Sequence, residues 1–368
     1  MTPRFFYHSS ASTKKVDALM PAQREVMTQK IILLYNMDSG WPRADQKEVR
    51  KLAEKMLNGL LRHGYEVEPI EIYKSLEALD GYDPLEWLVF NWCEGFEAMP
   101  WSDHLVAKEL EARGFAFTGS GSRTLKKNLD KWRVKHALRA ARVPTPPSRV
   151  MSSEIETDEW EFFPAIVKPV EQHSSIGITC HSVVDNRAAL ARQIRAVYGE
   201  FGQASLVEAF VDGREFHVAV WGNRKVEALP PVELDFSAFS NARERIYTYE
   251  CKFVRGSHGM MSIDWYCPSP KNTKLRAKIE AAAAAAYRAF GCRDYARMDV
   301  RLWNGRPMVV DLNTNPDLHP ESVFPMAAEA LGLKYGEMAA RLVELAMPRL
   351  KRKRTLQKSR AKELVAAI

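Results

Sequence analysis

The chain has 368 residues, 46% of them hydrophobic, which suffices for two or three folded domains and excludes an intrinsically disordered protein. Its net charge of +7 is concentrated in residues 349–363, where eight lysines and arginines accompany one glutamate, so nucleic acid is not an indicated partner of the fold. The five cysteines form no CxxC pair and no stretch approaches 18 uncharged apolar residues, which argues against zinc, disulfides and a membrane span and favours a cytoplasmic protein.

The first third of the chain alternates apolar runs with helical patterns. Residues 1–29 lack the apolar run of a signal peptide, and we expect a poorly ordered leader there. The pattern predicts strands at 30–36, 65–72 and 87–95 and helices at 48–64 and 104–114. This alternation predicts a parallel sheet covered by helices, and so an N-terminal α/β domain at 30–125.

The middle of the chain has a different pattern. A basic helix at 129–141 runs into "VPTPP", which we interpret as an extended connector. Five strands follow with little helix between them, which predicts antiparallel sheets; they are expected at 164–169, 177–183, 204–211, 214–221 and 225–234. Subdomains are expected at 126–211 and 212–347. The helix at 273–291 has six consecutive alanines that could lie close to a sheet, and 348–368 is expected to be a solvated or frayed basic tail.

A candidate metal site lies in "ARMDVRLWNGRPMVVDLNTNPD", which indicates two strands around an Asn-Gly turn. Asp299, Asp311 and Asn313 would offer the oxygen ligands that Mg²⁺ prefers. Because side chains alternate along a strand, a two-residue turn at Asn304 and Gly305 would put Asp299 on the opposite face from the other two. The alternative is that the acid and amides merely end a strand.

A candidate phosphate site lies in "PAIVKPVEQHSSIGI". Lys168 interrupts an apolar strand and precedes a polar loop with Ser174 and Ser175, so its ammonium and the loop N–H groups could bind phosphate. The alternative is a lysine that extends from a strand end into solvent.

A third segment, "SLVEAFVDGREF", places Glu208 and Glu215 around a short linker. The carboxylates could accept hydrogen bonds from an adenine amino group and ribose hydroxyls, with residues 209–211 lining the base. The alternative is a plain hairpin that turns at Asp212 and Gly213. Lys131 and Lys252 are isolated lysines, and each, judged singly, favours a solvated side chain over a catalytic one.

Together and in order, these segments resemble the ATP-grasp ligases, most closely the D-alanine–D-alanine ligase family, from about Lys30 to Ala346. The motifs are "FTGSGSRTLKKNLDKWRVKHAL", "PAIVKPVEQHSSIGI", "LVEAFVDGREFHVAV", "YTYECKF", "ARMDV" and "VVDLNTNPDLHPESVFPMAAEALGLKYGEM". The resemblance implies an α/β fold in which a parallel N-terminal domain precedes two ATP-grasp subdomains whose antiparallel sheets clasp ATP.

The resemblance also implies roles. Arg297, Lys252 and Ser175 would be catalytic, and two Mg²⁺ ions, or Mn²⁺, would bind at Asp299, Asp311 and Asn313. The ATP-binding residues would be Lys131, Lys168, Ser174, Ser175, Glu208, Ala209, Phe210, Val211, Glu215 and Lys252. Substrate contacts would come from Arg297, Phe253, Asp317, Ser322 and Glu94. The implied reaction is ATP-dependent amide formation between small carboxylates and amines, which we expect to be amino acids. A homodimer is compatible with the resemblance.

The sequence departs from the family pattern in its amino-acid-binding half. The family's glutamate after the first strand, which holds a substrate ammonium, is absent from "LLYNMDSGWPRADQKEV". Further departures are single residues. His173 and Asp317 stand where the family usually has glycine, Phe253 where it usually has tyrosine, and Asp311 where it more often has glutamate. We therefore expect a ligase with substrates other than two D-alanines. The alternatives are a cell-wall D-alanine–D-alanine ligase and a non-catalytic protein that binds acidic partners through its tail.

Overall fold

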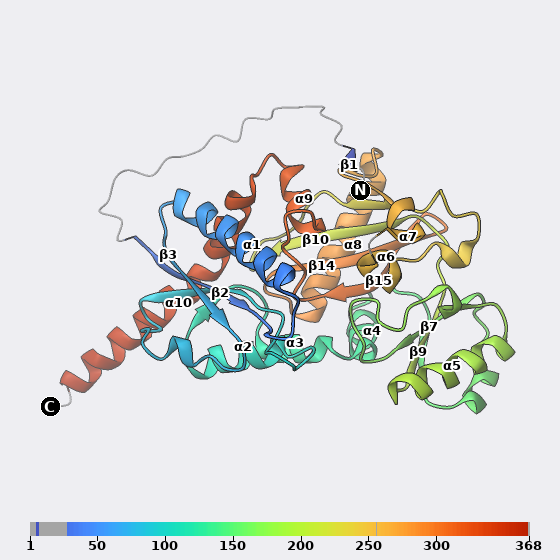
Figure 1. The fold of residues 1–368 in the computed structure, drawn as a ribbon, viewed down its shortest axis with the longest axis horizontal. Helices are drawn as coiled ribbons and strands as arrows, with labels where there is room; N and C mark the ends of the chain where they lie inside the picture. Colours follow the sequence, from blue (N-terminus) through green and yellow to red (C-terminus); the bar gives the residue numbers. More distant parts are fainter. Residues whose placement is uncertain (1–4, 7–27, 255, 367–368) are drawn as a thin grey trace.

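The computed structural model describes residues 5–6, 28–254 and 256–366 (Figure 1). Most of the expected leader therefore lies outside the described residues. Its described part includes strand β1 (Phe5–Phe6), which pairs in parallel with β13 (Asp264–Tyr266).

The N-terminal sheet is parallel, as predicted, with strand order β3-β2-β4-β5. Its strands are β2 (Lys30–Asn36), β3 (Glu66–Ile72), β4 (Trp87–Trp92) and β5 (Ala116–Phe117). Its helices are α1 (Arg43–Arg62) and α2 (Asp103–Ala112), and each buries one apolar stripe. Gly59 of α1 lies so close to Gly336 that an added Cβ would be 2.7 Å from the Gly336 Cα, so only glycine allows this approach.

Two helices lead into a four-stranded antiparallel sheet. Helices α3 (Ser122–Asn128) and α4 (Lys131–Ala140) precede strands in the order β6-β9-β7-β8, namely β6 (Ser148–Met151), β9 (Ser205–Ala209), β7 (Ala165–Pro169) and β8 (Val183–Val184). Helix α5 (Arg187–Phe201) covers the sheet; Asn186 caps its start and Gly202, at φ 64°, ends it. The strand predicted at 177–183 is wrong, because the polar segment forms turns and a short 3₁₀-helix before β8.

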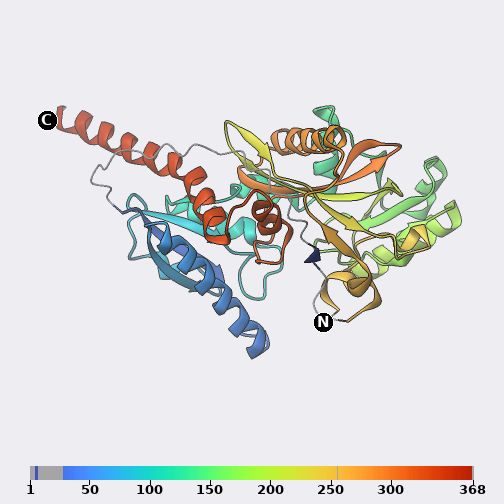
Figure 2. The same ribbon diagram turned by 90° about the horizontal axis from the view of Figure 1, so that it is seen from above.

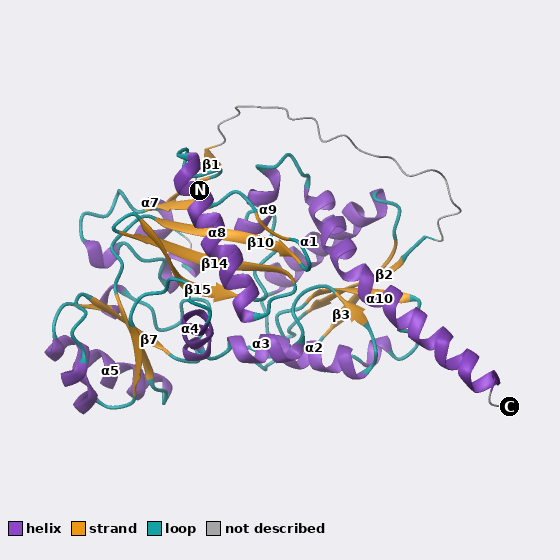
Figure 3. Ribbon diagram, turned by 180° about the vertical axis from the view of Figure 1, so that it is seen from behind, coloured by secondary structure: helices purple, strands orange, loops and turns teal. Residues whose placement is uncertain are grey.

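The largest sheet has seven strands, in the order β1-β13-β12-β10-β14-β15, with β11 paired to β10. The strands are β10 (Glu215–Gly222), β11 (Val226–Ala228), β12 (Val232–Asp235), β14 (Asp294–Trp303) and β15 (Arg306–Asn313). Helix α8 (Thr273–Phe290) lies across β10 and β14 in Figure 3. Its buried Ala283 and Ala286 belong to the same apolar cluster as Val218 and Met298, so the expected contact between the alanine face and a sheet is confirmed. Helices α6 (Tyr249–Phe253), α7 (His258–Ser262) and α9 (Val323–Glu329) complete this part.

The β14–β15 hairpin contains a bulge that the sequence analysis did not anticipate. Its turn has the expected two residues, since Trp303 pairs with Arg306 on either side of Asn304 and Gly305. The register shifts between Asp299 and Val300, however, so that Asp299 pairs with Asp311 and Val310 is the extra residue. The prediction that a two-residue turn would separate the acids is therefore wrong, because the bulge returns Asp311 to the face of Asp299.

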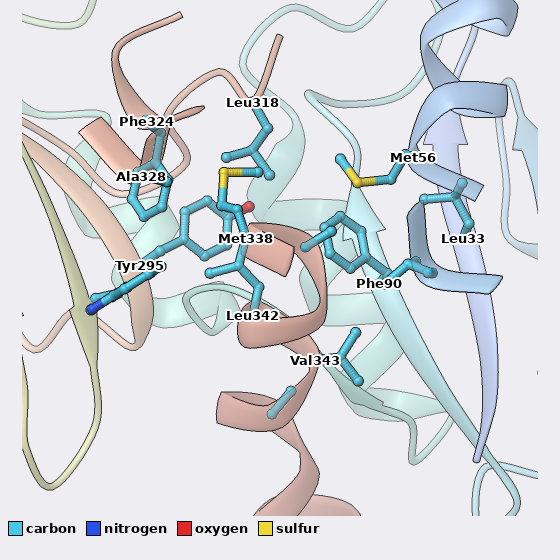
Figure 4. Close-up of a cluster of buried hydrophobic side chains, with 14 of the residues drawn as sticks. Leu33, Met56, Phe90, Tyr295, Leu318, Phe324, Ala328, Met338, Leu342 and Val343 are labelled. Carbon is cyan, nitrogen blue, oxygen red and sulfur yellow. The ribbon is translucent and has the colours of Figure 1, made fainter. Parts of the chain in front are cut away.

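Helix α10 (Tyr335–Ala366) joins the N-terminal domain to the largest sheet. The apolar cluster in Figure 4 combines Leu33 and Phe90 of the first sheet with Tyr295 of β14 and with Met338 and Leu342 of α10. The end of α10 projects from the body (Figures 1 and 2). The helix crosses the predicted boundary at 347/348 without a break, and the domain boundaries remain predictions.

The beginning of the predicted tail is docked. Leu350 is buried, and Arg349 pairs with the buried carboxylate of Asp294. Lys353 and Arg354 donate to backbone carbonyls of the N-terminal domain. The prediction of a solvated tail is thus wrong for Arg349, Leu350, Lys353 and Arg354, because Leu350 is buried and the three cations bind buried or partly buried acceptors, whereas Lys351 and Arg352 are exposed as expected.

Candidate active site

A cleft of about 1720 Å³ receives side chains from all three sheet regions. Every site residue predicted from the sequence lines it: Glu94, Lys131, Lys168, Ser174, Ser175, Glu208, Ala209, Phe210, Val211, Glu215, Lys252, Phe253, Arg297, Asp299, Asp311, Asn313, Asp317 and Ser322. The fold therefore brings together segments that lie more than 200 residues apart in the sequence.

The predicted metal ligands face one another on β14 and β15. Asp299 pairs with Asp311, and Arg297 with Asn313. The Arg297 guanidinium donates two hydrogen bonds to the Asp299 carboxylate, from Nε to Oδ1 at 2.7 Å and from Nη2 to Oδ2 at 3.0 Å. Burial raises the pKa of Asp299, but Arg297 and then His217 outweigh it and hold that pKa below its usual range. Two carboxylates and an amide suit a hard cation such as Mg²⁺ that takes its other ligands from phosphate and water. In the described part of the chain, no three His, Cys, Asp or Glu side chains converge as a closed metal site.

Three lysines point positive charge at the same cleft. Burial lowers the pKa of Lys131 to about 8, and burial together with Arg297 lowers that of Lys252 to about 8. Burial also acts to lower the pKa of Lys168, but Glu208 and Asp311 outweigh it, so that pKa is raised. Lys168 Nζ lies 3.2 Å from Glu208 Oε1. Near pH 7 all three ammonium groups are charged and can bind an anion.

The carboxylates predicted to contact a nucleoside are already engaged. Glu208 is 1% exposed and pairs with Lys168 and with the buried Lys135. Glu215 binds Arg301 Nε at 2.8 Å, and its other oxygen lies 3.0 Å from His217 Nε2. Burial acts to raise the pKa of Glu215, but Arg301 and His217 reverse it, so the carboxylate stays ionised.

The polar loop after β7 contacts both neighbouring parts of the molecule. Ser174 and Ser175 have φ values of 53° and 61°, a region that residues other than glycine seldom adopt. Ser175 Oγ donates to the Tyr247 carbonyl at 2.8 Å. The His173 ring lies 5.2 Å from that of Trp101, which belongs to the N-terminal domain. Burial and then Lys131 lower the pKa of His173 to about 4, so this ring is neutral near pH 7.

The end of the cleft toward the N-terminal domain is acidic. Glu94 is exposed toward the cleft, yet desolvation by surrounding protein, with Asp317 and Asp103 adding to it, raises its pKa to about 7. Among the described residues, no hydrogen bond is made to its carboxylate. Asp38 accepts from Gly40 N and Ala98 N, and Glu97 accepts from Ser39 N, so these two acids hold loops. The Asp317 carboxylate accepts from His319 N, and the Ser322 hydroxyl donates to the Asp317 carbonyl. Phe253 is 53% exposed and packs on Tyr249.

The comparisons with known proteins agree with this geometry. The family model for the D-ala D-ala ligase C-terminus matches residues 142–344, more than half of the chain. The chain belongs to the D-alanine–D-alanine ligase family. A D-alanine–D-alanine ligase of Desulforudis audaxviator is 31% identical over 78% of this chain and 89% of its own length. The uncharacterized protein y4sG of Sinorhizobium fredii is 30% identical over 83% of this chain and 88% of its own length.

Solved structures extend the likeness to the whole fold. The D-alanine–D-alanine ligase of Bacillus anthracis, crystallised with ATP, superposes with a TM-score of 0.67 at 20% identity and covers 89% of this chain and 99% of its own. The predicted ATP-grasp architecture is thereby confirmed. The family match and the curated relatives confirm the ligase class. In the described residues, no helix is long and apolar enough to cross a membrane.

Several residues that line this ligase cleft, or that support its lining as Lys135 supports Glu208, were missed by the sequence analysis. Lys135 shares a helical face with Lys131, and a lysine four residues after a candidate ligand was a usable signal. His217 lies two residues after Glu215 on a wholly buried strand, and Arg301 lies two residues after Asp299. Side chains two residues apart share one face of a strand, and this spacing was a usable signal. Tyr247 and Asp103 had no local signal, because only the tertiary fold brings them to the cleft.

Proposed function

We propose that the protein is an ATP-dependent carboxylate–amine ligase that forms an amide through an acyl phosphate and prefers substrates other than two D-alanines. The observation that carries the proposal is the division of one cleft. Its floor collects lysines, Arg297 and two acids. Its far end has Glu94, whose carboxylate accepts no hydrogen bond from the described residues, and lacks the family's glutamate after the first strand.

The donor set fits the cofactors of this family. Asp299, Asp311 and Asn313 would hold two Mg²⁺ ions, or Mn²⁺ in their place. When bound, these ions supply positive charge that balances the triphosphate. Lys131, Lys168 and the 174–175 loop would bind phosphate oxygens. The adenosine would lie along residues 208–211 and Glu215, where Phe210 and Val211 give an apolar surface.

The arrangement suits attack of a carboxylate oxygen on the γ-phosphorus of ATP, which forms the acyl phosphate and breaks the bond to the β-phosphate, so that ADP leaves. A carboxylate is repelled by the triphosphate, so the ammonium groups must screen that charge before its oxygen can approach. Lys252 would bind the γ-phosphate. When an amine then attacks the acyl phosphate, Arg297 would stabilise the oxyanion, and the phosphate leaves with the C–O bond electrons. The loop that contacts Tyr247 and Trp101 would keep water from the acyl phosphate.

The acidic end bears on substrate choice. A free α-ammonium in a desolvated pocket needs a carboxylate partner, because an unpaired buried charge costs several kcal/mol. Asp38, Glu97, Asp103 and Asp317 already accept backbone hydrogen bonds, so we take Glu94 as the acid that this end offers to an ammonium. Phe253 offers no hydroxyl across the two subsites, which supports a substrate pair different from two D-alanines.

The proposal is tested by product formation with D-alanine as sole amino acid, at millimolar concentration with Mg²⁺ and ATP. We expect turnover far below that with another carboxylate and amine pair, found by a phosphate-release screen with mass detection of products. Robust formation of the D-alanine dipeptide would overturn the substrate assignment and support the second candidate, an ordinary D-alanine–D-alanine ligase. That candidate is favoured by the activity named for relatives such as the Desulforudis audaxviator protein.

A further inference from the structure

Lys135 is a buried cation that lies outside the roles assigned above. Its side chain is 2% exposed and comes from the middle of α4. The ammonium pairs with Glu208 of β9 and donates to Thr145 Oγ1 at 3.0 Å, to the Val309 carbonyl at 3.3 Å and to the Val310 carbonyl at 2.8 Å. It therefore fastens the two antiparallel sheets to each other at the floor of the cleft.

Two of these acceptors belong to the bulge of β15. Val310 is the extra residue there, and a bulge leaves backbone groups without their regular ladder partners. The 144–145 connector helps to hold it, because Val309 N donates to the Pro144 carbonyl and Thr145 Oγ1 donates to the Val309 carbonyl, each at 2.8 Å. The next residue along the strand is Asp311, whose face is decided by the bulge. In a regular register without the bulge, Asp299 would pair with Val310, and Asp311 would point to the other side of the sheet.

We propose that Lys135 is a positioning residue for the metal and nucleotide sites: its ammonium holds the Val310 bulge that turns Asp311 toward Asp299 and simultaneously fixes Glu208. The inference rests on the proposed function and assigns Lys135 no contact with the reacting atoms. A buried ammonium suits this task because it donates three hydrogen bonds and balances the Glu208 charge, whereas an apolar side chain would leave the carbonyls and carboxylate with fewer partners.

The test compares Lys135→Met with Arg133→Met, which removes a cation from the exposed face of the same helix. Hydrogen exchange of peptides covering 306–313 is measured without ligand. We expect faster exchange in Lys135→Met and unchanged exchange in Arg133→Met.

Binding of Mn²⁺ in the presence of a non-hydrolysable ATP analogue should weaken by about 10- to 100-fold in Lys135→Met, as for loss of a residue that orients a metal ligand. The KM of the amine substrate should stay within about twofold, because that subsite does not contact Lys135.

Further variants separate the bulge from the charge of Glu208. Glu208→Gln combined with Lys135→Met leaves no unpaired buried carboxylate and should fold, yet its Mn²⁺ binding should stay weaker than that of Glu208→Gln alone. Thr145→Val, which removes one hydrogen bond to the bulge, should change exchange in the same direction by a smaller factor. If Lys135→Met keeps wild-type exchange over 306–313 and wild-type Mn²⁺ affinity, the positioning role is overturned. If the wild type binds no nucleotide at all, the proposed function fails instead.

Discussion

Arg297 and Asp299 illustrate how single residues of the site serve two purposes. Their bidentate pair holds both side chains on the β14 face, and it neutralises a carboxylate that has little access to solvent. A metal ion near Asp299 and Asp311 would compete with Arg297 for the same oxygens. Arg297 would then be free to turn toward the oxyanion, so that metal binding would release the arginine for its proposed role.

Replacement of Asp311 by asparagine should lower amide formation by about 100-fold or more, because it would remove a negative ligand from the proposed metal site. The unfolding free energy should change by less than about 1 kcal/mol, since the side chain is partly exposed at a strand end. Turnover, Mg²⁺ affinity and thermal stability are measured for this variant and for a control, Asp158→Asn, which changes an exposed acid far from Asp311 in the sequence. Near-normal turnover with unchanged Mg²⁺ affinity would contradict the metal assignment.

The depressed pKa values of Lys131 and Lys252 predict an alkaline limit. Both ammonium groups are charged below about pH 8 and lose their protons as pH rises through that value. The value of kcat/KM for ATP should therefore fall above pH 8, by about tenfold per pH unit for each lysine that is required. Lys252→Arg keeps its charge to higher pH and should make the decline less steep. A profile that stays flat to pH 9.5 in the wild type would show that neither ammonium titrates in this range.

At the scale of elements, periodicity predicted most of the helices and strands but could not predict how they are paired or fastened. Strand β2 and helix α8 match the expected ranges almost residue for residue, because apolar runs and a glycine cap are local signals. The Val310 bulge has no such signal, since a shift of one residue changes no composition. The docking of 349–354 was missed because it uses cations on buried or partly buried acceptors, with only Leu350 as an apolar anchor.

The docked start of the tail gives a prediction about truncation. Removal of residues 349–368 should destabilise the protein by about 3 to 5 kcal/mol, because the buried carboxylate of Asp294 loses Arg349. Removal of 355–368 leaves Arg349, Leu350, Lys353 and Arg354 in place and should leave stability and activity near wild type. The two truncations are compared by denaturant unfolding. Equal stability of both would show that the Arg349 contact contributes little.

For the molecule as a whole, the sequence predicted which segments meet better than how they meet. The motifs and, for Glu94, a strand-end position identified the residues that were expected at the site, from Glu94 to Ser322, and all of them line the cleft. The partners that hold those residues, such as Lys135 for Glu208 and Arg301 for Glu215, depend on contacts between elements far apart in sequence. Spacing can place Lys135 on the helical face of Lys131 and Arg301 on the strand face of Asp299, but it does not identify the residue on the opposite element, so these pairings became visible only in the fold.

The loop over the cleft gives the last prediction, which involves all three parts of the molecule. The loop is held by Ser175 to Tyr247 on one side and by the His173 ring to Trp101 on the other. A ring contact of this kind contributes about 0.5–1.5 kcal/mol, so Trp101→Ala should make the open loop about 2- to 10-fold more populated. Water would then reach the acyl phosphate, and more phosphate should be released for each amide formed.

Trp101→Phe keeps a ring and should retain most of the coupling between phosphate release and amide formation. Because the pKa of His173 is about 4, the effect should be the same at pH 6 and pH 8. The measurement is the ratio of phosphate to amide at saturating amine, and an unchanged ratio in Trp101→Ala would show that this contact does not keep water out.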